Sequence, residues 1–140
     1  MKKLLAAALL TIVSLTFIQC SDKGGDGPAP PDPCSETKLA VTTIPAINTT
    51  APAQVDATFP VTINITAGFP AAGATINVVA KNDATNAQFF EANPATVTAG
   101  VNNVTITGTP AGITAVVQVT VTSKNCPTNK WTGTFRYIRK

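Results

Sequence analysis

Three cysteines and the absence of histidine limit the chemistry that this 140-residue chain can perform. Without an imidazole, a Ser-His-Asp or Cys-His catalytic set and every histidine-ligated metal site are excluded. The globular part has four carboxylates, all in or beside predicted turns: Glu36, Asp56, Asp83 and Glu91. Hydrolysis by a carboxylate pair needs two such groups held about 5–9.5 Å apart. We therefore predict no enzyme activity, no catalytic residue, no cofactor and no metal ligand.

A turn and an aromatic pair are the remaining candidates for binding chemistry. Asn82, Asp83 and Asn86 could offer oxygen ligands to Ca²⁺, but a single carboxylate favours an ordinary turn. Phe89 and Phe90 are neighbours in a short predicted strand, where successive side chains point to opposite faces. Unless the strand is irregular, one of the two phenylalanines should be exposed. The pair is the candidate ligand contact.

The beginning of the chain carries the motif with the most specific chemistry. Two lysines precede an uncharged, mainly apolar run over residues 4–18, which is short for a bilayer span of about 20 residues. The run ends at Cys20, and Ser21 opens a polar segment rich in Gly and Pro. This arrangement resembles the signal peptide of bacterial lipoproteins. Gln19 departs from the usual motif, which has a small residue directly before the Cys.

The lipoprotein resemblance implies that residues 1–19 are a signal peptide that is removed, and that Cys20 becomes acylated. One acyl chain binds a membrane only marginally, whereas the several chains of this family, such as palmitate, anchor a protein effectively permanently. Ser21 is similar to the residue found in lipoproteins sorted to the outer membrane. We expect a lipid-anchored protein of the cell envelope, at the outer membrane. It could face either the periplasm or the cell surface. An ordinary secretory signal near a Cys is the alternative.

The charge of the chain argues against a nucleic-acid partner. Without residues 1–19 the net charge is +1, and only 12% of the whole chain is charged. Residues 92–140 carry five basic groups and no acidic one: Lys124, Lys130, Arg136, Arg139 and Lys140. Solvated strand edges and a C-terminal tail explain this patch more simply than attraction to acidic polysaccharide or phospholipid head groups.

Composition places the rest of the chain in the all-β class. Residues 20–140 contain 21 Thr, 12 Val and 8 Ile but a single Leu, Leu39, so good helix formers other than Ala are nearly missing. Residues 20–33 are rich in Gly and Pro and predict a flexible tether. Fully extended, the tether would span roughly 46–50 Å.

Short runs of alternating polar and apolar residues fill residues 34–140 and predict one domain. The predicted strands cover residues 38–44, 58–66, 74–81, 87–91, 95–98, 101–107, 113–123 and 130–138. Seven or eight half-buried strands fit an antiparallel β-sandwich. The pattern resembles the immunoglobulin/fibronectin type III superfamily in architecture, although the Trp and Cys hallmarks of antibody domains are missing. No binding site is carried over from that superfamily.

The immunoglobulin-like order implies a pairing of the two remaining cysteines. If Cys20 is lipidated in an oxidising compartment, Cys34 precedes the first strand and Cys126 follows the last strand but one, at the same pole. A disulfide between them would stabilise the fold by roughly 4–5 kcal/mol in the chain-entropy model. Two free thiols are the alternative. The same order implies that the tether, residues 67–73 and residues 126–130 share this pole. It also implies that residues 49–57, 82–87 and 108–112 lie at the other pole.

These observations predict a non-enzymatic, lipid-anchored cell-envelope protein whose immunoglobulin-like domain is an adhesion, protein-binding or spacer module. Its partners would be the membrane, through Cys20, and a protein or glycan of unknown identity. The alternative is an accessory glycan-binding lipoprotein that uses Phe89 or Phe90 with nearby Asn and Gln side chains.

Overall fold

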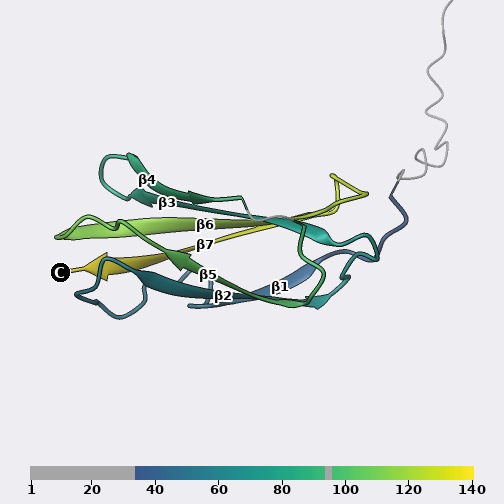
Figure 1. Ribbon diagram of the computed structural model, residues 1–140, viewed down its shortest axis with the longest axis horizontal. Coiled ribbons are helices and arrows are strands. Elements are labelled where there is room, and N and C mark those ends of the chain that lie inside the picture. The colour runs from purple at the N-terminus through teal and green to yellow at the C-terminus, as the bar shows by residue number, and fades with distance from the viewer. Residues whose placement is uncertain (1–33, 94–95) are drawn as a thin grey trace, which may run out of the picture.

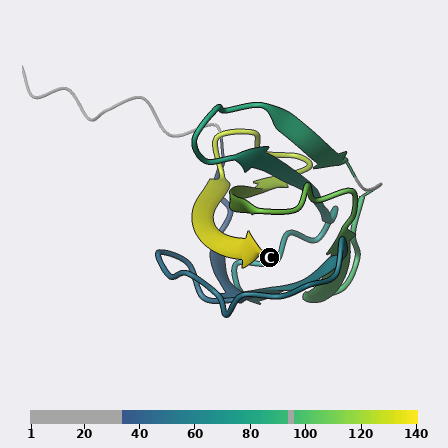
Figure 2. The same ribbon diagram turned by 90° about the vertical axis from the view of Figure 1, so that its left-hand side faces the viewer.

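Two antiparallel β-sheets lie face to face in the computed structural model, which describes residues 34–93 and 96–140 (Figure 1). The strands are β1 (Ala40–Ile44), β2 (Phe59–Ala67), β3 (Ala74–Asn82), β4 (Gln88–Ala92), β5 (Val101–Ile106), β6 (Ile113–Ser123) and β7 (Lys130–Arg139). One sheet has the order β1-β2-β5 and the other β4-β3-β6-β7. The described residues form no helix, so the all-β prediction is confirmed. Figure 2 shows the two layers end on.

Alternating apolar side chains build the core between the sheets. In β2, Phe59, Val61, Ile63 and Ile65 are buried, whereas the residues between them are exposed or half-buried. This period of two follows from the pleat of a strand, which points successive side chains to opposite faces. Strands β3 and β6 alternate in the same way. Across the layers, the ring of Phe59 stacks on that of Tyr137 with centroids 4.0 Å apart.

Pro60 lies inside β2 at a position where its missing N–H costs no ladder bond. The N–H of Ile65 donates to the carbonyl of Gly100 at 2.8 Å. Because hydrogen-bonded pairs alternate along an antiparallel ladder, the odd-numbered residues of β2 form the hydrogen bonds to β5. Pro60, opposite Thr105, is an even-numbered residue and forms no main-chain hydrogen bond to β5. On its other side β1 has already ended at Ile44. The proline is therefore compatible with a central strand.

Seven of the eight predicted strands are present, each within two residues of its predicted bounds. The prediction of a strand over residues 95–98 is wrong in its described part, since only Val97 makes a bridge, to Ala74. Residue 95 lies outside the described residues. On one side of this bridge Thr98 would have to pair with Gly73, whose φ of 88° turns the chain away.

The chain crosses from one sheet to the other after β1, through a cis bond before Pro45. Residues 48–54 then run parallel to β7, with bridges from Thr50 to Arg136 and from Gln54 to Arg139. The N–H of Ala51 donates to the carbonyl of Arg136 at 2.8 Å. This segment covers the outer edge of β7. On the opposite side of the sandwich, β4 and β5 are the edge strands, and they contact each other.

The connections gather at two ends, which we call the proximal and distal poles (Figure 1). The proximal pole holds Cys34, the β2–β3 loop and the β6–β7 loop, where the N–H of Lys124 donates to the carbonyl of Gly73. At the distal pole the N–H of Asp83 donates to the carbonyl of Thr114. The predicted positions of residues 67–73, 82–87, 108–112 and 126–130 are confirmed, whereas residues 49–54 lie along the edge of β7 and not at the distal pole. The tether lies outside the described residues.

Candidate functional site

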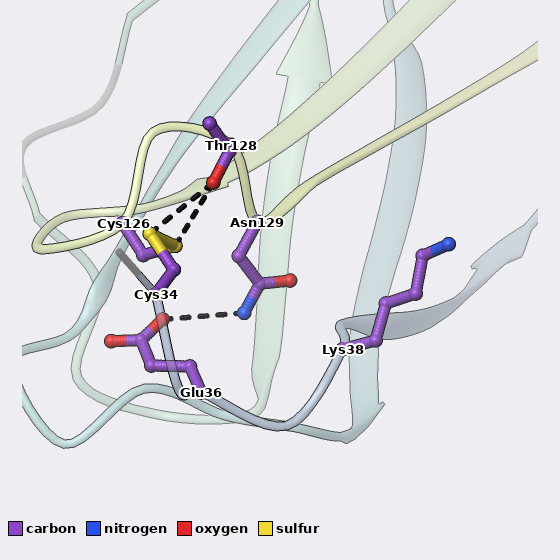
Figure 3. Close-up of a pocket in the computed structure, with 6 residues that line it drawn as sticks. All are labelled: Cys34, Glu36, Lys38, Cys126, Thr128 and Asn129. Atoms are coloured by element: carbon purple, nitrogen blue, oxygen red, sulfur yellow. Dashed lines mark hydrogen bonds between the residues drawn. A yellow bond between two sulfur atoms is a disulfide. The ribbon is translucent and has the colours of Figure 1, made fainter. Parts of the chain in front are cut away.

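A disulfide between Cys34 and Cys126 closes the proximal pole, and the predicted pairing is confirmed. The two Cα atoms are 5.5 Å apart, well within the range of protein disulfides. The hydroxyl of Thr128 lies 3.2 Å from the sulfur of Cys34 and 3.3 Å from that of Cys126 (Figure 3). The disulfide joins Cys34, which directly follows residues 1–33 in the chain, to the β6–β7 loop of the four-stranded sheet.

Asn129 forms a second cross-link at this pole, through hydrogen bonds, and the sequence analysis did not predict this role. Its side-chain carbonyl accepts a hydrogen bond from the N–H of Leu39 at 3.0 Å. Its amide donates to the carbonyl of Thr37 at 3.0 Å and to the carboxylate of Glu36 at 3.2 Å. Asn129 is buried, and these bonds fix the segment that leads into β1. An Asn in a turn-rich loop carries no sequence signal that distinguishes this role from ordinary turn formation.

The hollow between these residues has a volume of about 260 Å³ and is lined by Cys34, Glu36, Lys38, Cys126, Thr128 and Asn129. Its sulfurs are joined to each other, and its one buried amide is fully engaged. The side chain of Lys38 extends away from the other five (Figure 3). The contacts at this pole are therefore structural, and the lining offers no activated nucleophile. The predicted lipidation site, Cys20, and the tether lie outside the described residues.

Phe89 and Phe90 are both half-buried and both pack against the core, so the expectation that one of them is exposed is not met. The reason is an irregularity in β4. Phe90 pairs with Ala80, but the next residue of β3, Lys81, pairs with Gln88, which leaves Phe89 as an unpaired extra residue. Such a bulge changes the direction of side chains along a strand. Ligand contact by the two phenylalanines stays a prediction.

Beside them, a cluster of planar polar side chains surrounds Glu91. Its carboxylate accepts hydrogen bonds from Asn93 at 3.0 Å, from Gln88 at 3.0 Å and from Asn77 at 3.2 Å. Asn77 also donates to Asn93. These bonds, that from Asn93 first, lower the pKa of Glu91 below its ordinary value. The sequence pattern did not reveal this cluster because its members come from two strands and the residue after β4.

At the distal pole the structure favours the turn over a calcium site. The side-chain oxygen of Asn82 accepts hydrogen bonds from the N–H groups of Ala84 and Thr85. The carboxylate of Asp83 is held by Arg136 through bonds of 2.8 and 3.1 Å, which lower the pKa of Asp83. Within residues 34–93 and 96–140, no cluster of three potential metal-ligating side chains occurs.

The basic patch predicted in the C-terminal third is partly engaged in intramolecular contacts. Arg136 pairs with Asp83, and Arg139 donates to the carbonyls of Val55 and Thr109. These bonds hold two of the five cations at the surface of their own domain. They support the structural explanation of the patch over an electrostatic docking role.

The three-stranded sheet differs from its partner in carrying no charged residue at any position of β1, β2 or β5. The four-stranded sheet contains Lys81, Glu91, Lys130, Arg136 and Arg139. On the solvent face of the three-stranded sheet, Ile44 is 71% exposed and Val101 is 58% exposed. Depletion of charge is the compositional signal of interface cores. It could not be recognised from the chain alone, because it depends on which strands share a sheet.

No family model matches the chain, and no curated protein matches it either. Within the described residues, no helix is long and apolar enough to cross a membrane.

Proposed function

We propose that this chain is a non-enzymatic, lipid-anchored cell-envelope protein, and that its sandwich is an adhesion, protein-binding or spacer module. The anchor is the acylated Cys20, at the outer membrane. One observation carries the proposal: residues 1–33 attach at the proximal pole beside the Cys34–Cys126 disulfide, and the distal loops lie at the other end. A tether at one end of a rigid body presents the opposite end and the flanks to partners.

We further propose that the sandwich is immunoglobulin-like, with the architecture of the immunoglobulin/fibronectin type III superfamily. The strand orders β1-β2-β5 and β4-β3-β6-β7 support this, because they correspond to the first, second and fifth strands facing the other four. The passage of residues 48–54 from the first sheet to the edge of β7 supports it too. Architecture alone does not specify a ligand.

Photo-crosslinking in intact cells tests the proposed display. A photoreactive amino acid is placed at Val55 or Ala84, both exposed at the distal pole, or at Ala71 in the proximal β2–β3 loop. We expect discrete adducts from at least one of these positions in the anchored protein, and we expect the adducts to disappear with Cys20→Ala. An anchored protein that gives no adduct from either pole, or adducts that survive Cys20→Ala unchanged, would contradict the proposal.

Glycan binding is the second candidate, favoured by the cluster around Glu91. Planar amide and carboxylate groups beside half-exposed aromatic rings are the side chains that bind sugar hydroxyls and sugar faces. A glycan array probed with the full chain and with the Phe89→Ala/Phe90→Ala variant distinguishes the candidates. Binding that the double variant abolishes supports the glycan function, and a wild-type chain that binds no glycan removes it.

A further inference from the structure

The four edge strands of this sandwich differ in how they are protected from pairing with another chain. An unprotected edge is a template for strand addition, and proteins normally block it with cover, charge, bulges or proline. Residues 48–54 cover β7. Strand β1 is only five residues long and is followed directly by Pro45, and β4 has both a register shift between Ala80 and Lys81 and the charge of Glu91.

Strand β5 has none of these protections within residues 34–93 and 96–140. It pairs with β2 over six consecutive residues without a shift, and it contains no charge and no proline. Gly100 bonds to β2, and alternate residues of an antiparallel strand point their N–H and C=O groups to the same side. The main-chain groups of Val101, Asn103 and Thr105 therefore point away from β2, and no described strand pairs with them.

The arrangement of these three residues suits a second copy of the same strand. They are symmetric about Asn103, so an antiparallel copy would pair Asn103 with its own counterpart and Val101 with Thr105 twice. Every pair would be of the hydrogen-bonded type, and all six side chains would lie on the solvent face. Asn103 accepts a bond from the hydroxyl of Thr62 at 2.9 Å, and its amide hydrogens have no partner among the described residues. Each Asn103 could donate to the other.

Electrostatics and burial favour the same occupant. The three-stranded sheet is free of charge, so a copy that extends it meets no like charge on that face. Val101, 58% exposed as a monomer, would be covered by the neighbouring strand. Phe89 and Phe90, half-buried on the adjacent edge strand β4, lie on the same side of the sandwich.

We propose that two copies of this chain pair through the outer edges of β5, antiparallel, and that they do so from opposing membranes. Antiparallel pairing places the proximal pole of one copy beside the distal pole of the other. The two attachment points for the tethers then lie at opposite ends, which suits anchors in two facing surfaces rather than in one. This inference rests on the proposed function and specifies its adhesion partner as a second copy of the chain.

Vesicle clustering tests the pairing with the lipidated full-length mature chain. The protein is reconstituted in two populations of phosphatidylethanolamine/phosphatidylglycerol vesicles that carry donor and acceptor dyes. We expect protein-dependent energy transfer between populations. Val101→Lys/Thr105→Lys puts lysines opposite each other at two positions, and we expect clustering to fall about tenfold or more. The matched control is Thr75→Lys/Thr132→Lys, which adds the same charge to exposed positions of the four-stranded sheet and should leave clustering unchanged.

Charge exchange tests the register. Vesicles that carry Val101→Glu/Thr105→Glu should not cluster with themselves but should cluster with vesicles that carry Val101→Lys/Thr105→Lys, because each lysine then faces a glutamate. Attached wild-type protein that fails to cluster vesicles, or clustering that the β5 variants do not change, would overturn the inference. Failure of the mixture to cluster would overturn the register.

Flotation of the same vesicles separates this inference from the anchor. If the protein does not float with lipid, the proposed anchor fails, and sedimentation equilibrium of the full chain in solution then decides the pairing. We expect a dimer that the lysine variant dissociates. A monomer at every concentration would overturn the inference.

Discussion

The hydroxyl oxygens of Thr109 and Tyr137 lie 2.6 Å apart in the interior of the sandwich. Thr109 belongs to the loop that crosses from β5 to β6, and Tyr137 belongs to β7, so this hydrogen bond joins the crossover to the four-stranded sheet. Both residues are fully buried. Each hydroxyl depends on the other, because a buried polar group without a partner is costly.

Removal of either hydroxyl should therefore destabilise the fold. We expect Thr109→Val to lower the free energy of unfolding by about 1–3 kcal/mol, since it leaves the Tyr137 hydroxyl buried without its partner. Tyr137→Phe should lower the free energy of unfolding by a similar amount, because it leaves the Thr109 hydroxyl buried without its partner. The double variant should cost less than the sum of the two single ones. Urea denaturation measures all four proteins, and strictly additive effects would contradict the coupling.

The ionisation of Tyr137 gives a pH-dependent test, because it is the one tyrosine of the chain. Burial raises its pKa above the ordinary value of 10.0, and the bond to Thr109 offsets part of that rise. The folded state thus holds the phenolic proton more tightly than the unfolded state. This stabilisation is complete below about pH 10 and is lost as the pH rises through the raised pKa.

Phenolate absorbance of the folded protein should accordingly titrate above pH 10.0 and return to about 10 in denaturant. The denatured protein is the internal control. A folded protein that titrates at or below its denatured midpoint would be inconsistent with a buried Tyr137.

Asp83 should titrate in the opposite sense. Hydrogen bonds from Arg136 lower its pKa below 3.8, so the pair favours the folded state above about pH 4, and this effect is lost as the pH falls through the lowered pKa. We expect Arg136→Gln to raise the carboxyl pKa of Asp83 in an NMR titration. Glu91 is the control, because its pKa is lowered by Asn93, Gln88 and Asn77 instead. An unchanged Asp83 titration would refute the pairing in solution.

Loss of the disulfide should weaken the proximal pole and the whole fold. We expect Cys34→Ser/Cys126→Ser to lower the free energy of unfolding by about 2–5 kcal/mol, because the 92-residue separation leaves a long unconstrained loop in the unfolded state. Denaturation with and without reductant measures the effect. The double variant should not respond to reductant, and a wild-type protein that is equally stable when reduced would contradict a stabilising role.

The strands were predictable from sequence because their alternation is local. Val117, Val119 and Val121 face the core between polar neighbours, and β6 has the predicted bounds. The Cys34–Cys126 pairing was predictable once a sandwich order was assumed. Side-chain direction in β4 was not, because the bulge at Phe89 arises from pairing with β3 and leaves no mark in the alternation.

The surfaces were the least predictable feature. The bonds of Asn129 join residues separated by about 90 positions, and nothing local indicates them. Likewise, the charge-free sheet emerges only when β5 is placed beside β2 instead of β4, its predecessor in the chain. Long-range pairing determines both, whereas composition and alternation report only which residues are buried.

Intact mass spectrometry of the chain extracted from membranes tests the anchor most directly. We expect the polypeptide to begin at Cys20 and to carry a diacylglyceryl group and an amide-linked acyl chain, with both modifications absent from Cys20→Ala. A chain that retains residues 1–19, or one that begins elsewhere with an unmodified Cys20, would show that the domain is not held at a membrane by lipid.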